Sequence, residues 1–162
     1  MLRPLLFLDV DGPLLPFGAP EGHPTYPSGQ GSAADANPLL ARLNPALGPR
    51  LAALPCELVW ATSWMADANE CIAPRLGLPD LPVVTWPDPS PQDAGLHWKT
   101  PGLLRWAAGR PFCWVDDEIT DPDRAWVSRH HGGRSLLHRV DPRRGLTDAD
   151  FSVITDWMPR SR

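Results

Sequence analysis

The residues best suited to chemistry in this sequence are two aspartates that follow a short apolar run. Leu5-Leu6-Phe7-Leu8 is followed directly by Asp9-Val10-Asp11-Gly12. Such a run predicts a buried strand, and parallel α/β sheets bind ligands beyond the carboxyl ends of their strands. Strand side chains two apart project to the same side, so Asp9 and Asp11 would repel each other unless a cation lay between them. The pair therefore indicates a metal site, with an Asp-rich turn as the structural alternative.

Two further apolar runs end in polar residues. Leu58-Val59-Trp60-Ala61 precedes Thr62 and Ser63, and the run from 112 to 115 precedes Asp116 and Asp117. If all three runs are parallel strands, these side chains gather at one edge of the sheet. The sequence thus predicts one site built from three strand ends.

Lys99 is the only lysine in a chain with 14 arginines. It stands directly before Thr100-Pro101, a pair typical of a helix start. A compact ammonium fits between a carboxylate and a phosphoryl oxygen better than a planar guanidinium does. Lys99 is therefore a candidate ligand for a phosphoryl group, against the alternative of a solvated residue before a helix.

Strands and helices are expected to alternate along the chain. We predict strands at 5–8, 57–61, 81–85, 112–115 and 135–140, and helices at 39–54 (interrupted by prolines), 64–76, 100–107, 121–131 and from 147 onward. This alternation predicts an α/β fold with a doubly wound parallel sheet of five main strands. Residues 13–38 are rich in Gly, Pro and Ser and are predicted to form a long loop beside the site.

The four polar motifs, taken in order, resemble those of the haloacid dehalogenase (HAD) superfamily. They are Asp9-Val10-Asp11-Gly12, Val59-Trp60-Ala61-Thr62, Lys99, and Trp114-Val115-Asp116-Asp117, and the resemblance extends from residue 5 to about residue 125. It implies a HAD-like Rossmannoid fold and Mg²⁺-dependent phosphomonoester hydrolysis. Only the 13–38 loop and a short segment at 86–98 could hold an insertion. The chain is therefore similar to the capless, phosphatase-like branch, as a single domain over residues 1–162.

The resemblance also implies a role for each residue. Asp9 would be the nucleophile that forms an aspartyl-phosphate, and Asp11 the general acid and base. Thr62, Ser63, Lys99 and the turn at Gly12 would bind the phosphoryl oxygens. Mg²⁺ would be held by Asp9, the backbone carbonyl of Asp11, and Asp116, either alone or with Asp117.

Charge and composition restrict the partners. The net charge is −4, and the arginines are scattered along the chain, so a protein built to coat nucleic acid is not indicated. The sequence has no apolar run long enough to span a bilayer and no recognisable leader, so a cytoplasmic protein without a membrane partner is expected. The expected partner is a phosphorylated substrate, either a small molecule or the end of a macromolecule, and the oligomeric state is left open.

Three alternatives stay open beside the general phosphatase. They are a nucleic-acid end or nucleotide phosphatase of the same fold, a catalytically idle HAD-like binding module, and a dehalogenase, which would not use the acidic pair at 116–117. Trp64, Trp86 and Trp98 lie near the motifs and could stack on a nucleobase. We interpret each of them first as a packing residue, because tryptophan is usually well buried.

Overall fold

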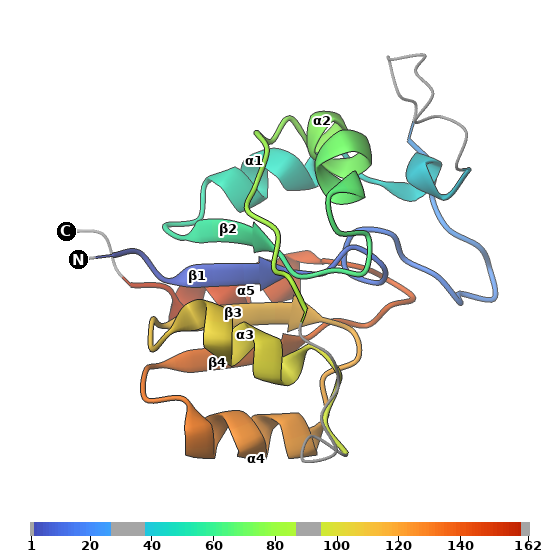
Figure 1. The fold of residues 1–162 in the computed structure, drawn as a ribbon. Helices are drawn as coiled ribbons and strands as arrows, with labels where there is room; N and C mark the ends of the chain where they lie inside the picture. Colours follow the sequence, from blue (N-terminus) through green and yellow to red (C-terminus); the bar gives the residue numbers. More distant parts are fainter. Residues whose placement is uncertain (1, 27–37, 87–94, 160–162) are drawn as a thin grey trace.

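The protein has a four-stranded parallel sheet at its centre. The computed structural model describes residues 2–26, 38–86 and 95–159 of the chain. The strands are β1 (Leu5–Leu8), β2 (Glu57–Trp60), β3 (Phe112–Asp116) and β4 (Ser135–Arg139). They lie in the order β2-β1-β3-β4, with every neighbouring pair parallel, so all four arrows in Figure 1 point the same way. The chain moves from β1 to one side and then crosses to the other, so a topological switch point lies between β1 and β3.

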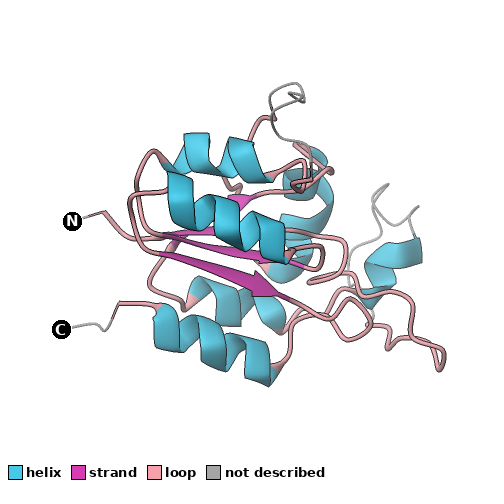
Figure 2. Cartoon of the chain, turned by 90° about the horizontal axis from the view of Figure 1, so that it is seen from below, coloured by secondary structure: helices cyan, strands magenta, loops and turns pink. Residues whose placement is uncertain are grey.

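Helices cover both faces of the sheet, as Figure 2 shows. They are the 3₁₀-helix η2 (Pro38–Arg42), α1 (Leu47–Ala52), the π-helix η3 (Ala68–Ile72), α2 (Ala73–Leu76), α3 (Thr100–Ala107), α4 (Asp121–His130) and α5 (Asp148–Trp157). The helical region predicted over 39–54 is therefore two short helices, as its prolines indicated. The prediction of a doubly wound α/β fold is confirmed.

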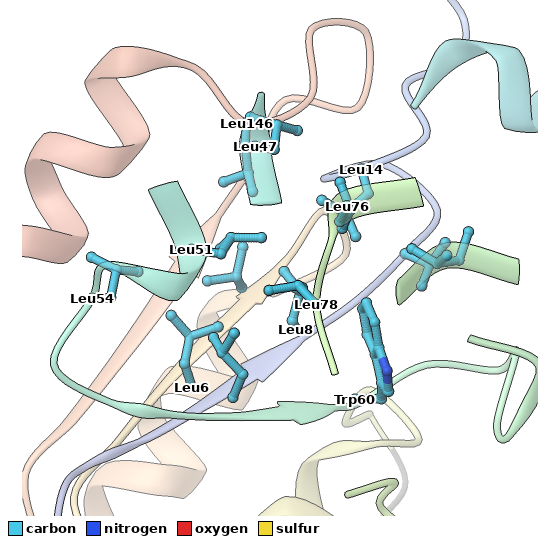
Figure 3. Close-up of a cluster of buried hydrophobic side chains, with 14 of the residues drawn as sticks. Leu6, Leu8, Leu14, Leu47, Leu51, Leu54, Trp60, Leu76, Leu78 and Leu146 are labelled. Atoms are coloured by element: carbon cyan, nitrogen blue, oxygen red, sulfur yellow. The ribbon is translucent and has the colours of Figure 1, made fainter. Parts of the chain in front are cut away.

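The alternation of side chains along β1 divides the apolar core into two clusters. Leu6 and Leu8 lie in one cluster with residues of α1, α2 and α5, and Figure 3 shows them together with Leu51 and Leu76. Leu5 points to the other face of the sheet and lies in the second cluster, together with residues of α3 and α4. Burial on both faces explains why β1 is a continuous apolar run rather than an alternating one.

The prediction of a fifth strand at 81–85 is wrong for the described structure. This segment lies beside β2, but only an isolated bridge joins Val83 to Trp60. The Trp60 N–H donates to the Pro82 carbonyl (2.9 Å), and the Val84 N–H donates to the Trp60 carbonyl (3.0 Å). A ladder continued toward the start of β2 would next need an N–H from Pro82, which proline lacks.

Two helices begin at the predicted residues, Thr100 and Asp121, but the residue that caps each of them is the one before. Lys99, not Thr100, is the N-cap of α3, and Thr120, not Asp121, is the N-cap of α4. Thr120 forms a capping box with Asp123, whereas the Thr100 hydroxyl donates to Asp123 from inside the first turn of α3. The side chain of Asp123 therefore joins the starts of two helices.

Two predicted segments lie partly outside the described residues. Residues 27–37 of the predicted 13–38 loop and residues 87–94 of the 86–98 segment are not described. The described residues 16–26 contain no helix or strand. Within the part of the chain that the structure covers, no helix has the length and apolar character needed to cross a membrane.

Candidate active site

The carboxyl ends of β1 and β3 bring two aspartates side by side at the switch point. Leu8 of β1 pairs with Val115 of β3, and the next residues along the two strands are Asp9 and Asp116. The Asp9 N–H donates to the Val115 carbonyl at 3.1 Å, which continues the ladder by one bond. The strand register therefore places both carboxyl groups at the same edge of the sheet.

The ammonium group of Lys99 lies between these two carboxylates. Its Nζ atom is 3.0 Å from Asp9 Oδ1 and 2.7 Å from Asp116 Oδ2, and Lys99 is only 3% exposed. Burial alone would lower the pKa of Lys99, but the carboxylates of Asp9 and Asp116 outweigh this effect and raise the pKa above its usual value. Lys99 is thus held as a buried cation.

Asp9, Asp116 and Asp117 form a compact acidic cluster. One carboxylate oxygen from each lies within 4.8 Å of the other two, and all three residues are buried. Burial raises the pKa of Asp9 to about 8, with Lys99 opposing the shift and Asp116 adding to it. Burial, together with the charge of Asp116, raises the pKa of Asp117 to about 6.

The acidic cluster suits a metal ion by the chemistry of its donors. Three carboxyl groups face a single ammonium group, so the fully ionised cluster carries excess negative charge in a buried place. Hard divalent cations such as Mg²⁺ take carboxylate oxygen ligands of this kind. The residues present therefore fit such an ion, which would relieve the repulsion that burial imposes.

Asp11 occupies a turn just beyond this cluster. Its carboxylate oxygen Oδ2 accepts a hydrogen bond from the Trp64 indole N–H at 3.2 Å, and the side chain is half-buried. The group of three clustered carboxylates does not include it. This placement leaves the Asp11 carboxyl group at the edge of the site, and its predicted contact with a metal through the backbone carbonyl stays a prediction.

Gly12 packs directly against Asp117. Its φ is +100°, and a Cβ atom built on it would lie 2.7 Å from Asp117 Cγ. A side chain at this position would be both strained and in collision with a member of the acidic cluster. Glycine here keeps the turn after β1 tight against the site.

Thr62 reaches the same edge through the pairing of β2 with β1. The Ala61 N–H donates to the Leu8 carbonyl at 2.9 Å, and Thr62 follows, fully buried. Its hydroxyl accepts from the Trp64 backbone N–H at 3.1 Å, and a hydroxyl that accepts one bond can still donate its hydrogen. Ser63, also predicted to bind substrate, is exposed.

Sequence reasoning missed the role of Asp123, which is fully buried. Its Oδ1 accepts from the His97 N–H (2.8 Å) and the Thr100 hydroxyl (2.7 Å), and its Oδ2 accepts from the N–H and hydroxyl of Thr120. Burial alone would raise the pKa of Asp123, but these hydrogen bonds hold it below its usual range. The spacing of Thr120 and Asp123 is that of a capping box and could have placed Asp123 at the helix start, but no local signal could have revealed the bonds that flank Lys99.

Each of the three tryptophans near the motifs contacts a residue of the candidate site. The Trp64 indole donates to Asp11, the Trp86 indole N–H lies 3.5 Å from the Thr62 carbonyl, and Lys99 Nζ lies 5.4 Å from the centre of the Trp98 ring. Trp64 and Trp86 are half-buried, in keeping with packing. Trp98 is 48% exposed, so the interpretation of this residue as a buried packing residue is wrong.

The doubly wound parallel sheet and this set of residues at its carboxyl edge define a HAD-type domain. Residues 5–151 match the family described as the HAD domain in Swiss Army Knife RNA repair proteins, so the chain belongs to that family. The resemblance seen in the four motifs is thereby confirmed. The family is one of hydrolases, and the described part of the chain contains no separate cap domain. Neither the curated proteins nor the solved structures gave a match to this chain.

Proposed function

We propose that this protein is a Mg²⁺-dependent phosphomonoester hydrolase in which Asp9 carries the phosphoryl group as an aspartyl-phosphate. The observation that supports this most strongly is the buried Lys99 ammonium, 3.0 Å from Asp9 and 2.7 Å from Asp116. A nucleophilic carboxylate and a fixed cation beside it are the parts that phosphoryl transfer to a carboxylate requires.

In the first step, a carboxylate oxygen of Asp9 attacks the phosphorus atom. A cation bound at the cluster would favour the ionised form of Asp9 that this step needs, against the effect of burial on its pKa. The bond from phosphorus to the ester oxygen breaks, and Asp11 donates a proton to the departing alcohol. In the second step, water attacks the phosphorus of the aspartyl-phosphate and gives a proton to Asp11, and phosphate leaves as the Asp9 carboxylate is restored. The Trp64 indole holds Asp11 Oδ2, so Oδ1 is the oxygen that handles the proton in both steps.

Lys99 and Thr62 are assigned to the non-bridging oxygens of the transferred phosphoryl group. Both are buried, so their charge and dipole act in a medium that screens them weakly. Mg²⁺ would be held by Asp9, Asp116 and Asp117 and, when bound, would offset the repulsion between the carboxylate nucleophile and the anionic phosphate. In this assignment Asp117 is a ligand together with Asp116, because its carboxyl group belongs to the same cluster.

A narrower second candidate is a phosphatase that acts on the end of a nucleic acid or on a nucleotide. The description of the family, which concerns RNA repair proteins, favours it. The net charge of −4 weighs against a long electrostatic interface. A strand end, however, needs contacts to only a few nucleotides.

The proposal is tested by hydrolysis of an aryl phosphate in Mg²⁺ and in chelator, with wild type, Asp9→Asn and Asp11→Asn. We expect turnover that requires Mg²⁺, no detectable turnover in Asp9→Asn, and a loss of about 10²–10⁴-fold in kcat for Asp11→Asn. A 5′- or 3′-phosphorylated RNA oligonucleotide assayed in parallel separates the two candidates. If the wild type hydrolyses no phosphoester with any divalent metal, the proposal is overturned in favour of an idle binding module.

A further inference from the structure

Trp98 is the exposed aromatic residue nearest in sequence to the candidate catalytic groups. It directly precedes Lys99, whose Nζ lies 5.4 Å from the centre of the Trp98 ring. Nearly half of its surface is open to solvent, whereas Lys99 is buried. A flat apolar surface therefore lies next to the cation that is assigned to the phosphoryl group.

The ring of Trp98 contacts two aromatic neighbours. Trp86 and Trp98 form a T-shaped pair, with ring centres 5.0 Å apart and planes at 78°, and His97 stacks on Trp98 at 5.5 Å and 28°. Edge-to-face and offset-stacked contacts of this kind stabilise the ring in the orientation observed. The contacts with Trp86 and His97 therefore favour one position of the exposed Trp98 ring.

Partly buried hydrogen bonds also hold the backbone on both sides of Trp98. The His97 N–H donates to Asp123, and the Lys99 N–H donates to His97 Nδ1 at 3.1 Å. The opposite ring nitrogen, His97 Nε2, lies 3.2 Å from Glu118 Oε2, and the His97 side chain is 7% exposed. The same small network therefore sets the positions of Lys99 and Trp98 relative to each other.

We propose that Trp98 is the stacking surface for the nucleobase of the nucleotide whose phosphate is hydrolysed. This inference rests on the proposed phosphatase function and names a substrate class for that same site. Stacking on an indole tolerates any base because every base has a π face. One ring beside the phosphoryl position suits a single terminal nucleotide, because it offers a stacking surface to one base.

The test compares two substrates that differ only in the terminal base. One is a short RNA oligonucleotide with a terminal phosphate, and the other is the same oligonucleotide with an abasic terminal residue. The ratio of kcat/KM for the first over the second is measured for wild type, Trp98→Ala, Trp98→Phe and Trp106→Ala. Trp106 is a fair control because it is also partly exposed (38%) and lies on α3, seven residues beyond Lys99, or about 10 Å along the helix.

We expect the wild type to favour the base-bearing substrate by about 5- to 100-fold, which corresponds to the usual strength of base stacking on an aromatic side chain. Trp98→Ala should bring this ratio close to one, mainly through KM, Trp98→Phe should keep most of it, and Trp106→Ala should leave it unchanged. A ratio that is equal in wild type and Trp98→Ala overturns the stacking role while leaving the phosphatase in place.

A failure of the proposed function gives a different pattern, because the wild type would then hydrolyse neither substrate. In that case, the affinity of the wild type and Trp98→Ala for the two oligonucleotides, measured by titration calorimetry, still decides the stacking role. Weaker binding of only the base-bearing strand by Trp98→Ala supports it. Equal binding of both strands by both proteins overturns it.

Discussion

Gly12 lies against the carboxyl group of Asp117, and this contact makes it a sensitive position for the whole site. Gly77, at the end of α2, provides the matched control because its φ is +71° but a Cβ atom there would meet nothing within 4 Å. Both Gly12→Ala and Gly77→Ala should lose about 1–2 kcal/mol of stability from the left-handed backbone alone.

Only Gly12→Ala should also weaken metal binding and hydrolysis, because its Cβ atom would displace the Asp117 carboxyl group. Urea unfolding gives the stability of both variants, and Mg²⁺ titration followed by tryptophan fluorescence gives the affinity. Equal Mg²⁺ affinities for Gly12→Ala and Gly77→Ala would contradict the assignment of Asp117 to the metal cluster.

Single residues also show the limit of sequence reasoning. The four motifs located Asp9, Lys99, Asp116 and Thr62, which the structure brings to one edge because parallel strands end together. The sequence did not predict the exposure of Trp98 or the hydrogen bonds that Asp123 accepts from His97 and Thr100. These two bonds depend on how α3 packs against α4, and they join residues more than 20 positions apart.

At the scale of elements, Asp123 acts as a clamp between two helices, because its carboxylate accepts hydrogen bonds from Thr100 at the start of α3 and from Thr120 at the start of α4. Asp123→Asn replaces one carboxylate oxygen with an NH2 group, which cannot accept the two hydrogen bonds directed at that oxygen. We therefore expect the free energy of unfolding to fall by about 2–4 kcal/mol at neutral pH. We also expect lower kcat, because the segment that carries Lys99 is released.

Asp150→Asn is the matched control for Asp123→Asn. Asp150 forms the same kind of capping box with Thr147 at the start of α5. Its other partner is the His138 ring, whereas Asp123 also binds His97 and Thr100. It should lower stability without lowering kcat of the folded enzyme. An unchanged kcat in Asp123→Asn would contradict the positioning of Lys99 by the clamp.

The clamp also predicts a pH dependence of stability. The pKa of Asp123 is held below its usual value, so its ionised form stabilises the fold fully above the unfolded-state pKa of about 3.9, and this contribution is lost as pH falls through the lower folded-state pKa. The difference in unfolding free energy between wild type and Asp123→Asn should be constant from about pH 8 to pH 5 and shrink below about pH 4. A difference that grows on acidification would be inconsistent with this account.

The contact between α1 and α2 gives a second prediction at this scale. A Cβ atom on Gly48 would lie 1.7 Å from the backbone carbonyl oxygen of Leu76, so the two helices can approach only because position 48 has no side chain. Gly48→Ala should destabilise the protein by about 2–3 kcal/mol, whereas Gly132→Ala, where nothing lies within 4 Å of the added atom, should change stability by less than about 0.5 kcal/mol. Equal urea midpoints for the two variants would show that α1 and α2 can separate without cost.

The fifth predicted strand illustrates why elements are harder to predict than motifs. Residues 81–85 have the composition of a strand and lie where a strand would pair with β2, but Pro82 removes the donor that a longer ladder needs. The parallel, doubly wound sheet with helices on both faces did follow from the alternation of strands and helices. The segment at 81–85 forms only an isolated bridge because the N–H that would extend the ladder is missing at Pro82.

At the scale of the whole molecule, the acidic cluster couples metal binding to stability. A ligand that binds only the folded state at 100 times its Kd stabilises by about 2.7 kcal/mol. The wild type should therefore melt at a higher temperature in Mg²⁺ than in chelator, and Asp116→Asn should lose most of this shift. Scanning calorimetry measures both, and a wild type that melts at the same temperature in Mg²⁺ and in chelator would contradict a metal site at the cluster.

The central claim is that Asp9 becomes phosphorylated during turnover, and acid quenching tests it most directly. The enzyme is mixed with Mg²⁺ and a phosphate-labelled substrate, quenched within the first turnover, digested and examined by mass spectrometry. We predict one phosphoryl group on the peptide that contains Asp9, labile in alkali as expected for an acyl phosphate, and none in Asp9→Asn. Full Mg²⁺-dependent hydrolysis by Asp9→Asn, with no labelled peptide in the wild type, would contradict the account.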